Sequence, residues 1–195
     1  MGIAHFVEEL QQLKQNPPAT LFRWQGYRIT WVIMLVTTLF LELCALYFQY
    51  IAHMDPCERC VYQRLAVMLL GLASVVIMVS PQQRVLRLLG YGIWLMGAAY
   101  GLSEAINQTA DYAGFNPFSS SCSLQPVFPF ELPLDNWWPT MFQPTGICGA
   151  DNWTLFSLNM AQWMVIIFSI YLLAAAVCIL SSAYGWLKKI SPVSR

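Results

Sequence analysis

The sequence predicts an all-α integral membrane protein built as a bundle of four transmembrane helices. Hydrophobic residues make up 57% of the 195 residues and charged residues only 10%, whereas an average soluble domain carries about 25% charged residues. Four segments are apolar over the roughly 20 residues that a helix needs to cross a bilayer, and none alternates as a membrane β-strand does. The net charge of zero leaves no basic surface for a nucleic-acid partner.

Each of the four segments is expected to cross the membrane once. The first runs from about Ile29 to Ala52, and the second runs from Val61 to Ser80, where Pro81 ends it. The third, from Leu88 to Ile106, is the least hydrophobic of the four, and the last runs from Gln162 to Ala183.

Basic residues predict the orientation, because Lys and Arg are enriched in cytoplasmic segments of membrane proteins. They occur in the N-terminal arm (1–28), in the short connection 81–87 and in the tail (184–195), but nowhere in the long loop 107–161. We therefore expect both termini in the cytoplasm. The long loop and the short loop 53–60 should then face the outer side.

Four of the six cysteines belong to these two outer loops. Cys57 and Cys60 form a Cys-x-x-Cys before the second segment, and Cys122 and Cys148 lie in the long loop. Disulfides persist on the oxidising side of a membrane, so two structural bridges are one interpretation. A Cys-x-x-Cys closes a very small ring that restrains the unfolded chain little, which favours redox chemistry for that motif.

The position of the motif favours a reactive thiolate. Asp55-Pro56 predicts a helix start, with Cys57 and Cys60 in the first turn, where free N–H groups and the helix dipole stabilise a thiolate. Arg64 follows Cys60 by four residues and shares its helix face. This cation favours the Cys60 thiolate and accounts for one of the two basic residues on the outer side; the other is Arg59.

Three further residues lie inside the predicted helices. Glu42 is an acid within the first segment, and such residues usually face the bundle interior and are often functional, although a structural hydrogen bond is the alternative. Cys44 and Cys178 lie at different depths, so we expect them to stay unpaired. No metal site is expected, since structural zinc usually takes its ligands from two closely spaced pairs.

Two features of the remaining sequence concern packing. Gly97-x-x-x-Gly101 in the third segment permits close approach of a neighbouring helix. The long loop is rich in aromatic residues, which favour the membrane interface. We expect a short helix within Leu132–Phe142 that lies on the outer membrane surface, and a hydrophobic cap over the bundle is a compatible alternative.

Several stretches match a known pattern: LEL at 41–43, ALYFQ at 45–49, PCERCVYQR at 56–64, Pro117-Phe118 before Cys122, LPLDNW at 132–137, Gly146-Ile147-Cys148, and MAQW at 160–163. In them the chain resembles the DsbB family of bacterial inner-membrane disulfide-bond formation proteins, including its DsbI-type paralogues. The resemblance covers about residues 29–183.

The resemblance implies an order of disulfide exchange among the four loop cysteines. A soluble periplasmic thiol oxidase of the DsbA type, with a thioredoxin fold, would arrive reduced and attack Cys122. The released Cys148 would then attack Cys57 and free Cys60 as a thiolate. Electrons would pass to the membrane quinone pool, as ubiquinone, or as menaquinone without oxygen.

The resemblance also implies a quinone site at the start of the second helix. Arg64 resembles the family's quinone-site arginine, and we place it with Cys60 and Glu42 as the candidate quinone-binding residues. Three features depart from the pattern: Glu58-Arg59 stands where apolar residues are expected, Gln63 stands where an acidic residue is expected, and the N-terminal arm is longer than usual.

Two other functions remain open from the sequence. A membrane redox enzyme of the vitamin K epoxide reductase type also combines a quinone with two cysteine pairs, but its Cys-x-x-Cys lies late in the bundle. A non-catalytic four-helix scaffold in contact with lipid would use the loop disulfides only as braces. Reduction of quinone by a reduced thiol partner distinguishes the enzyme from the scaffold.

Overall fold

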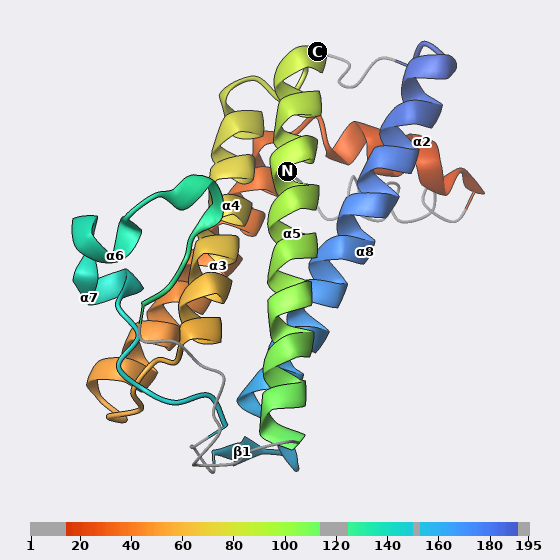
Figure 1. Cartoon of the computed structure of the whole chain (residues 1–195). Coiled ribbons are helices and arrows are strands. Elements are labelled where there is room, and N and C mark those ends of the chain that lie inside the picture. Colours follow the sequence, from red (N-terminus) through yellow and green to blue (C-terminus); the bar gives the residue numbers. More distant parts are fainter. Residues whose placement is uncertain (1–14, 114–124, 150–152, 191–195) are drawn as a thin grey trace.

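Four long helices run along one another in the computed structural model, which describes residues 15–113, 125–149 and 153–190 (Figure 1). They are α3 (Arg28–Tyr50), α4 (Glu58–Val79), α5 (Arg84–Ala113) and α8 (Met160–Leu187). Each is long and apolar enough to cross a membrane. The predicted fold class, an all-α membrane protein with a bundle of four transmembrane helices, is confirmed.

The centre of the bundle lies around α4, which packs on α3 at one side and on α5 at the other, while α8 packs on α5. The two glycines predicted to allow close helix approach have different partners. A Cβ on Gly97 would lie 3.0 Å from the Cβ of Leu69 in α4, and a Cβ on Gly101 would lie 2.2 Å from the ring of Phe168 in α8. Small residues in α5 therefore permit both close contacts. The core consists of Trp31, Met34, Ala66, Val67, Leu70, Ala73, Ile77, Tyr91, Trp94, Ala98, Ala105, Phe168 and Ala175.

The helix α5 is longer than the hydropathy of the sequence predicts. It begins four residues before Leu88 and continues seven residues beyond Ile106, to Ala113. The extra turns carry polar residues, and two of them, Gln108 and Asp111, contact residues of α4 or its N-cap. Hydropathy assigns such residues to a loop because it measures affinity for lipid, whereas these side chains face another helix.

The helix α8 begins at Met160, two residues before the predicted start. A capping box determines this end, because the side chain of Asn159 accepts a hydrogen bond from the backbone of Gln162 and the side chain of Gln162 accepts one from the backbone of Asn159. A two-residue hairpin precedes the cap, formed by β1 (Thr154–Leu155) and β2 (Leu158–Asn159) in antiparallel register.

A short helix in the N-terminal arm, α2 (Pro17–Trp24), packs against the end of α8 (Figure 1). The residue that follows it, Gln25, is buried and connects three elements. Its side-chain oxygen accepts hydrogen bonds from Tyr91 of α5 and Ser182 of α8, and its backbone oxygen accepts one from Trp31 of α3. These bonds hold the arm against the end of the bundle that is opposite the Cys-x-x-Cys.

The long loop carries three short helical elements, η1 (Pro129–Glu131), α6 (Leu134–Trp137) and α7 (Pro139–Phe142). The single short helix expected within Leu132–Phe142 is thus broken into two, because Pro139 cannot continue the helix of the preceding residues. The aromatic residues of this loop form two groups, one buried as a hydrophobic cap over the bundle requires and one exposed as a surface segment requires. Phe128 and Phe142 are buried against α4, whereas Trp137 and Trp138 are 67% and 53% exposed.

Candidate functional site

Cys57 and Cys60 lie at the start of α4, as the sequence predicts. Cys57 is the N-cap residue and Cys60 lies in the first turn. Both thiols are free, and their Sγ atoms are 3.0 Å apart, so a disulfide bond of about 2.05 Å requires only a small movement. The hydrogen bond with Cys60, together with burial, raises the pKa of Cys57 above its usual value. The proton of the pair therefore stays on Cys57, and the charge of the reduced pair belongs on Cys60.

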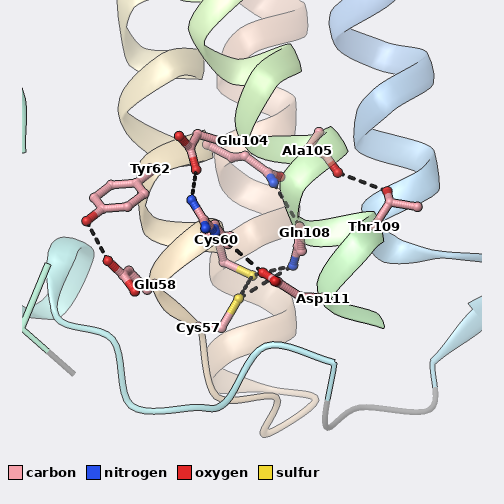
Figure 2. A network of polar contacts seen from close by, with 11 residues as sticks. Cys57, Glu58, Cys60, Tyr62, Glu104, Ala105, Gln108, Thr109 and Asp111 are labelled. Carbon is pink, nitrogen blue, oxygen red and sulfur yellow. Dashed lines mark hydrogen bonds and ion pairs between the residues drawn. The ribbon is translucent and has the colours of Figure 1, made fainter. Parts of the chain in front are cut away.

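A buried amide from α5 covers the two sulfurs. The Nε2 atom of Gln108 donates to Cys60 Sγ over 3.2 Å and to Cys57 Sγ over 3.5 Å (Figure 2). The orientation of this amide is fixed by Gln63, whose Nε2 donates to Gln108 Oε1 over 2.7 Å. Since the oxygen of Gln108 is engaged with Gln63, its NH₂ group is turned toward the sulfurs. A donor in this position stabilises negative charge on Cys60.

A cavity of about 340 Å³ lies beside Cys60, between α3, α4 and α8. Phe40, which lines it, is 64% exposed on the outside of the bundle. Its polar lining residues include Cys60, Arg64 and Glu42. The remaining walls are largely apolar, with Phe40, Leu41, Ala45, Phe48, Met54, Pro56, Val67, Trp153, Leu155, Met160, Trp163, Met164 and Ile167 among them.

Arg64 is only 6% exposed and connects three elements at this cavity. Its Nη1 atom donates to Gln49 Oε1 over 2.7 Å and to the carbonyl of Met141 over 3.2 Å, and its Nη2 atom donates to the carbonyl of Ala45 over 3.3 Å. Both side-chain oxygens of Glu42 are buried in the same region, and neither has a hydrogen-bond partner among the described residues. The cavity thus combines a cation, a carboxyl group and a sulfur within apolar walls.

The second loop approaches the Cys-x-x-Cys through its backbone. The N–H groups of Thr145 and Gly146 donate to the carbonyl of Pro56 over 2.9 and 3.1 Å. Gly146 lies so close to Asp55 that a Cβ on it would be 2.4 Å from the carbonyl oxygen of Asp55. The segment that leads to Cys148 therefore lies beside the segment that leads to the Cys-x-x-Cys.

Cys148 itself is buried and disulfide-bonded. Cys122 lies outside the described residues. The two cysteines inside the membrane segments, Cys44 and Cys178, are both free, as predicted. Among the residues that the structure describes, no group of three or more metal-ligating side chains is found.

Comparison with known proteins identifies the family to which this arrangement belongs. The profile of the family described as "Disulfide bond formation protein DsbB" matches residues 27–178, most of the chain. The chain belongs to the DsbB family. A protein named Disulfide bond formation protein B from Shewanella loihica is 42% identical over 161 residues, which cover 83% of this chain and 94% of that protein.

Two further relatives carry the same name. The protein from Shewanella amazonensis is 43% identical over 147 residues, covering 75% of this chain and 86% of its own. The one from Shewanella denitrificans is 42% identical over 147 residues, covering 75% and 83%. The resemblance found in the sequence is therefore confirmed, and with it a role in disulfide-bond formation. Membership in the DsbB family favours this role over the two alternatives left open by the sequence.

Within this family fold, the structure brings together most of the predicted site. Cys60, Arg64 and Glu42 line one cavity, with Cys57 in direct contact with Cys60. The sequence analysis did not identify Gln108, because hydropathy placed it in the long loop, 48 residues from Cys60 along the chain. The sequence did contain one indication of this contact: Gln63 stands where an acidic residue is expected. An amide at that position can donate a hydrogen bond to a second amide, whereas an ionised acid cannot.

Proposed function

We propose that this DsbB-family protein is a thiol:quinone oxidoreductase of the bacterial inner membrane. It reoxidises a periplasmic thiol oxidase of the DsbA type and passes the electrons to the quinone pool, with both termini in the cytoplasm and both loops in the periplasm. The proposal depends chiefly on one observation: Cys60 and Arg64 share a largely apolar cavity between α3, α4 and α8, and one of its walls, Phe40, is exposed on the outside of the bundle.

The residues around this cavity fit a quinone head group, which is a flat apolar ring with two carbonyl oxygens. When bound, ubiquinone, or menaquinone without oxygen, supplies a two-electron and two-proton acceptor. Arg64 has N–H groups beyond those used for Gln49, Ala45 and Met141 and orients a carbonyl oxygen. The buried oxygens of Glu42, which lack a hydrogen-bond partner among the described residues, are placed to hold a proton at the same cavity. A cavity of about 340 Å³ is within the usual range of ligand sites.

The exchange of disulfides begins in the second loop. One thiolate of the reduced partner attacks Cys122 of a Cys122–Cys148 bond and releases Cys148. The Cys148 thiolate attacks Cys57 and releases Cys60, whose charge the amide of Gln108 stabilises.

Three further transfers return the chain to its starting state. The second partner thiol displaces Cys122 and leaves the partner oxidised. Cys122 then attacks Cys148, which restores the loop bond and releases Cys57. Re-formation of the Cys57–Cys60 bond delivers two electrons and, with two protons, reduces the acceptor.

Quinone reduction by the purified chain tests the proposal. The full-length protein in lipid nanodiscs is mixed with a reduced DsbA-type protein and a short-chain ubiquinone, and the loss of quinone absorbance is followed. We expect one quinone to be reduced for each partner dithiol oxidised. Cys60→Ala should abolish the reaction, whereas Cys178→Ala, which removes a free cysteine elsewhere in the bundle, should retain it. A folded chain that reduces no quinone would refute the proposal.

The same mixture tests the roles of the second-loop cysteines. Because Cys148→Ala lacks the resolving thiol, it should accumulate a mixed disulfide between Cys122 and the partner, seen as a reductant-sensitive band on a non-reducing gel. If Cys122→Ala accumulates the same species equally well, the order of attack is wrong.

A further inference from the structure

Arg59 lies between the two cysteines of the motif and forms ion pairs with α5. Its Nη1 atom is 2.7 Å from Glu104 Oε2, and its Nε atom is 3.4 Å from Asp111 Oδ2. The side chains of all three residues are largely shielded from solvent, with 29%, 12% and 22% exposed in the order Arg59, Glu104 and Asp111. These contacts account for the second basic residue at the Cys-x-x-Cys end of the bundle.

The two carboxylates bracket Gln108 along α5. Glu104 lies four residues before Gln108 and Asp111 lies three residues after it, so all three side chains share one helix face (Figure 2). Arg59 therefore contacts α5 one turn before and one turn after the amide that covers the sulfurs. The Gln108 amide and the two carboxylates on either side of it all face the first turn of α4.

Arg59 is not placed to act on the sulfurs as a free cation. Its single positive charge is matched by two carboxylates at ion-pair distance, so the cluster of Arg59, Glu104 and Asp111 has no net positive charge. Its influence on Cys57 and Cys60 must therefore pass through geometry. Between its two contacts on α5 lies Gln108, which donates to both sulfurs.

We propose that Arg59 is a positioning residue that holds α5 on both sides of Gln108, keeps the Gln108 amide on the Cys57–Cys60 pair, and thereby makes that disulfide a stronger oxidant. Hydrogen bonds to a thiolate stabilise the reduced form of a dithiol, and a stabilised reduced form raises the oxidising power of the disulfide. The inference deepens the proposed function, since it concerns the redox equilibrium of the same pair.

The equilibrium of the pair with glutathione tests the inference without any quinone or partner protein. The full-length chain carries Cys122→Ser and Cys148→Ser in every sample, so that the equilibrium constant for oxidation refers to Cys57 and Cys60. Gln108→Leu, which removes the donor at similar volume, should raise this constant about tenfold, equivalent to a potential about 30 mV lower.

The deciding measurement is a double-mutant cycle between positions 59 and 108. Arg59→Met should raise the oxidation constant about three- to tenfold when Gln108 is present, and less than about twofold in the Gln108→Leu chain. Arg59→Lys, which keeps the charge, should return most of the parent value. Arg84→Met is the matched control, because Arg84 lies at the other end of α5, and it should leave the constant unchanged.

Two results would overturn the inference. One is an equal effect of Arg59→Met in both chains, which would mean that Arg59 acts on the sulfurs directly; the other is no effect in either. If Arg59→Met does not fold, Glu104→Gln replaces it in the same cycle and carries the same expectations. The proposed function can fail independently of these results, because quinone reduction is not part of the measurement.

Discussion

Arg64 has two structural roles, and a single substitution would remove both at once. Its guanidinium holds α3 and α7 against α4 through Gln49, Ala45 and Met141, and it also lines the proposed quinone cavity. Loss of the side chain removes a cation from the cavity and three hydrogen bonds from the packing of the bundle. A useful experiment at this residue must separate the two effects.

We predict that Arg64→Ala raises the KM for quinone by about tenfold or more, because a charge-assisted hydrogen bond contributes about 1.5–3 kcal/mol. Arg64→Lys should restore only part, since Lys keeps the charge but lacks the planar fork. Gln49→Ala removes the shortest of the Arg64 packing contacts and leaves the cation, so its KM should rise less. Steady-state kinetics in nanodiscs provide the measurement. Equal KM values for Arg64→Ala and Gln49→Ala would show that Arg64 acts only by packing.

For single residues, the sequence could predict those whose role depends on residues only a few positions away in the chain. Cys57, Cys60 and Arg64 belong to one helix start, and their spacing is sufficient to place them together. Gln108 and Glu104 act across a helix contact that joins residues more than 40 positions apart. No pattern within a short window contains that information. The departure at Gln63 could indicate that a buried amide lies nearby, but it could not place that amide at Gln108, and nothing local indicated the ion pair.

Among the elements, the contact between Thr145-Gly146 and Asp55-Pro56 determines how the two segments that lead to Cys148 and Cys57 meet. Both N–H groups bind one carbonyl, and the absence of a Cβ at Gly146 permits the close approach. Cys148 follows this contact by two residues, and Cys57 follows Pro56 directly. The efficiency of exchange between the loops should therefore depend on this single glycine.

We predict that Gly146→Ala slows disulfide transfer between the two cysteine pairs by about 10- to 100-fold, because a displacement of about 1 Å has a cost of that order for reacting groups. Acid quenching followed by mass spectrometry measures the rate of transfer. The glutathione equilibrium of Cys57 and Cys60 alone should not change. Gly92→Ala is the matched control, since nothing lies within 4 Å of a Cβ at that position. An unchanged transfer rate in Gly146→Ala would contradict the prediction.

The limits of the elements show what hydropathy can and cannot measure. The first membrane helix was expected at about 29–52, and α3 spans Arg28–Tyr50. The third was expected at about 88–106, and α5 spans Arg84–Ala113. The helix α3 is largely exposed on the outside of the bundle, so its composition reflects lipid. The last turns of α5 face the polar start of α4, so their composition resembles that of a loop.

For the whole molecule, the orientation in the membrane is a prediction from charge alone. Fusion of alkaline phosphatase after Arg195 should give no activity, because that enzyme requires the periplasm. An epitope inserted between Glu131 and Leu132, two exposed residues of the long loop, should be accessible to antibody on spheroplasts. An active phosphatase fusion, or an epitope reached only after cell lysis, would reverse or refute the proposed topology.

The position of the proposed quinone cavity has a consequence for how binding to this protein is measured. The proposed quinone cavity lies between these helices, and one of its walls, Phe40, is exposed on the outside of the bundle. A ligand that arrives by this route is supplied from the hydrocarbon phase, where it is dissolved, rather than from the buffer. Its effective concentration is then a mole fraction in the membrane, so diluting the sample with buffer leaves occupancy unchanged, while adding lipid or detergent lowers it. Affinities measured with different amounts of lipid or detergent become comparable only when they are expressed as mole fractions of the ligand in the membrane phase.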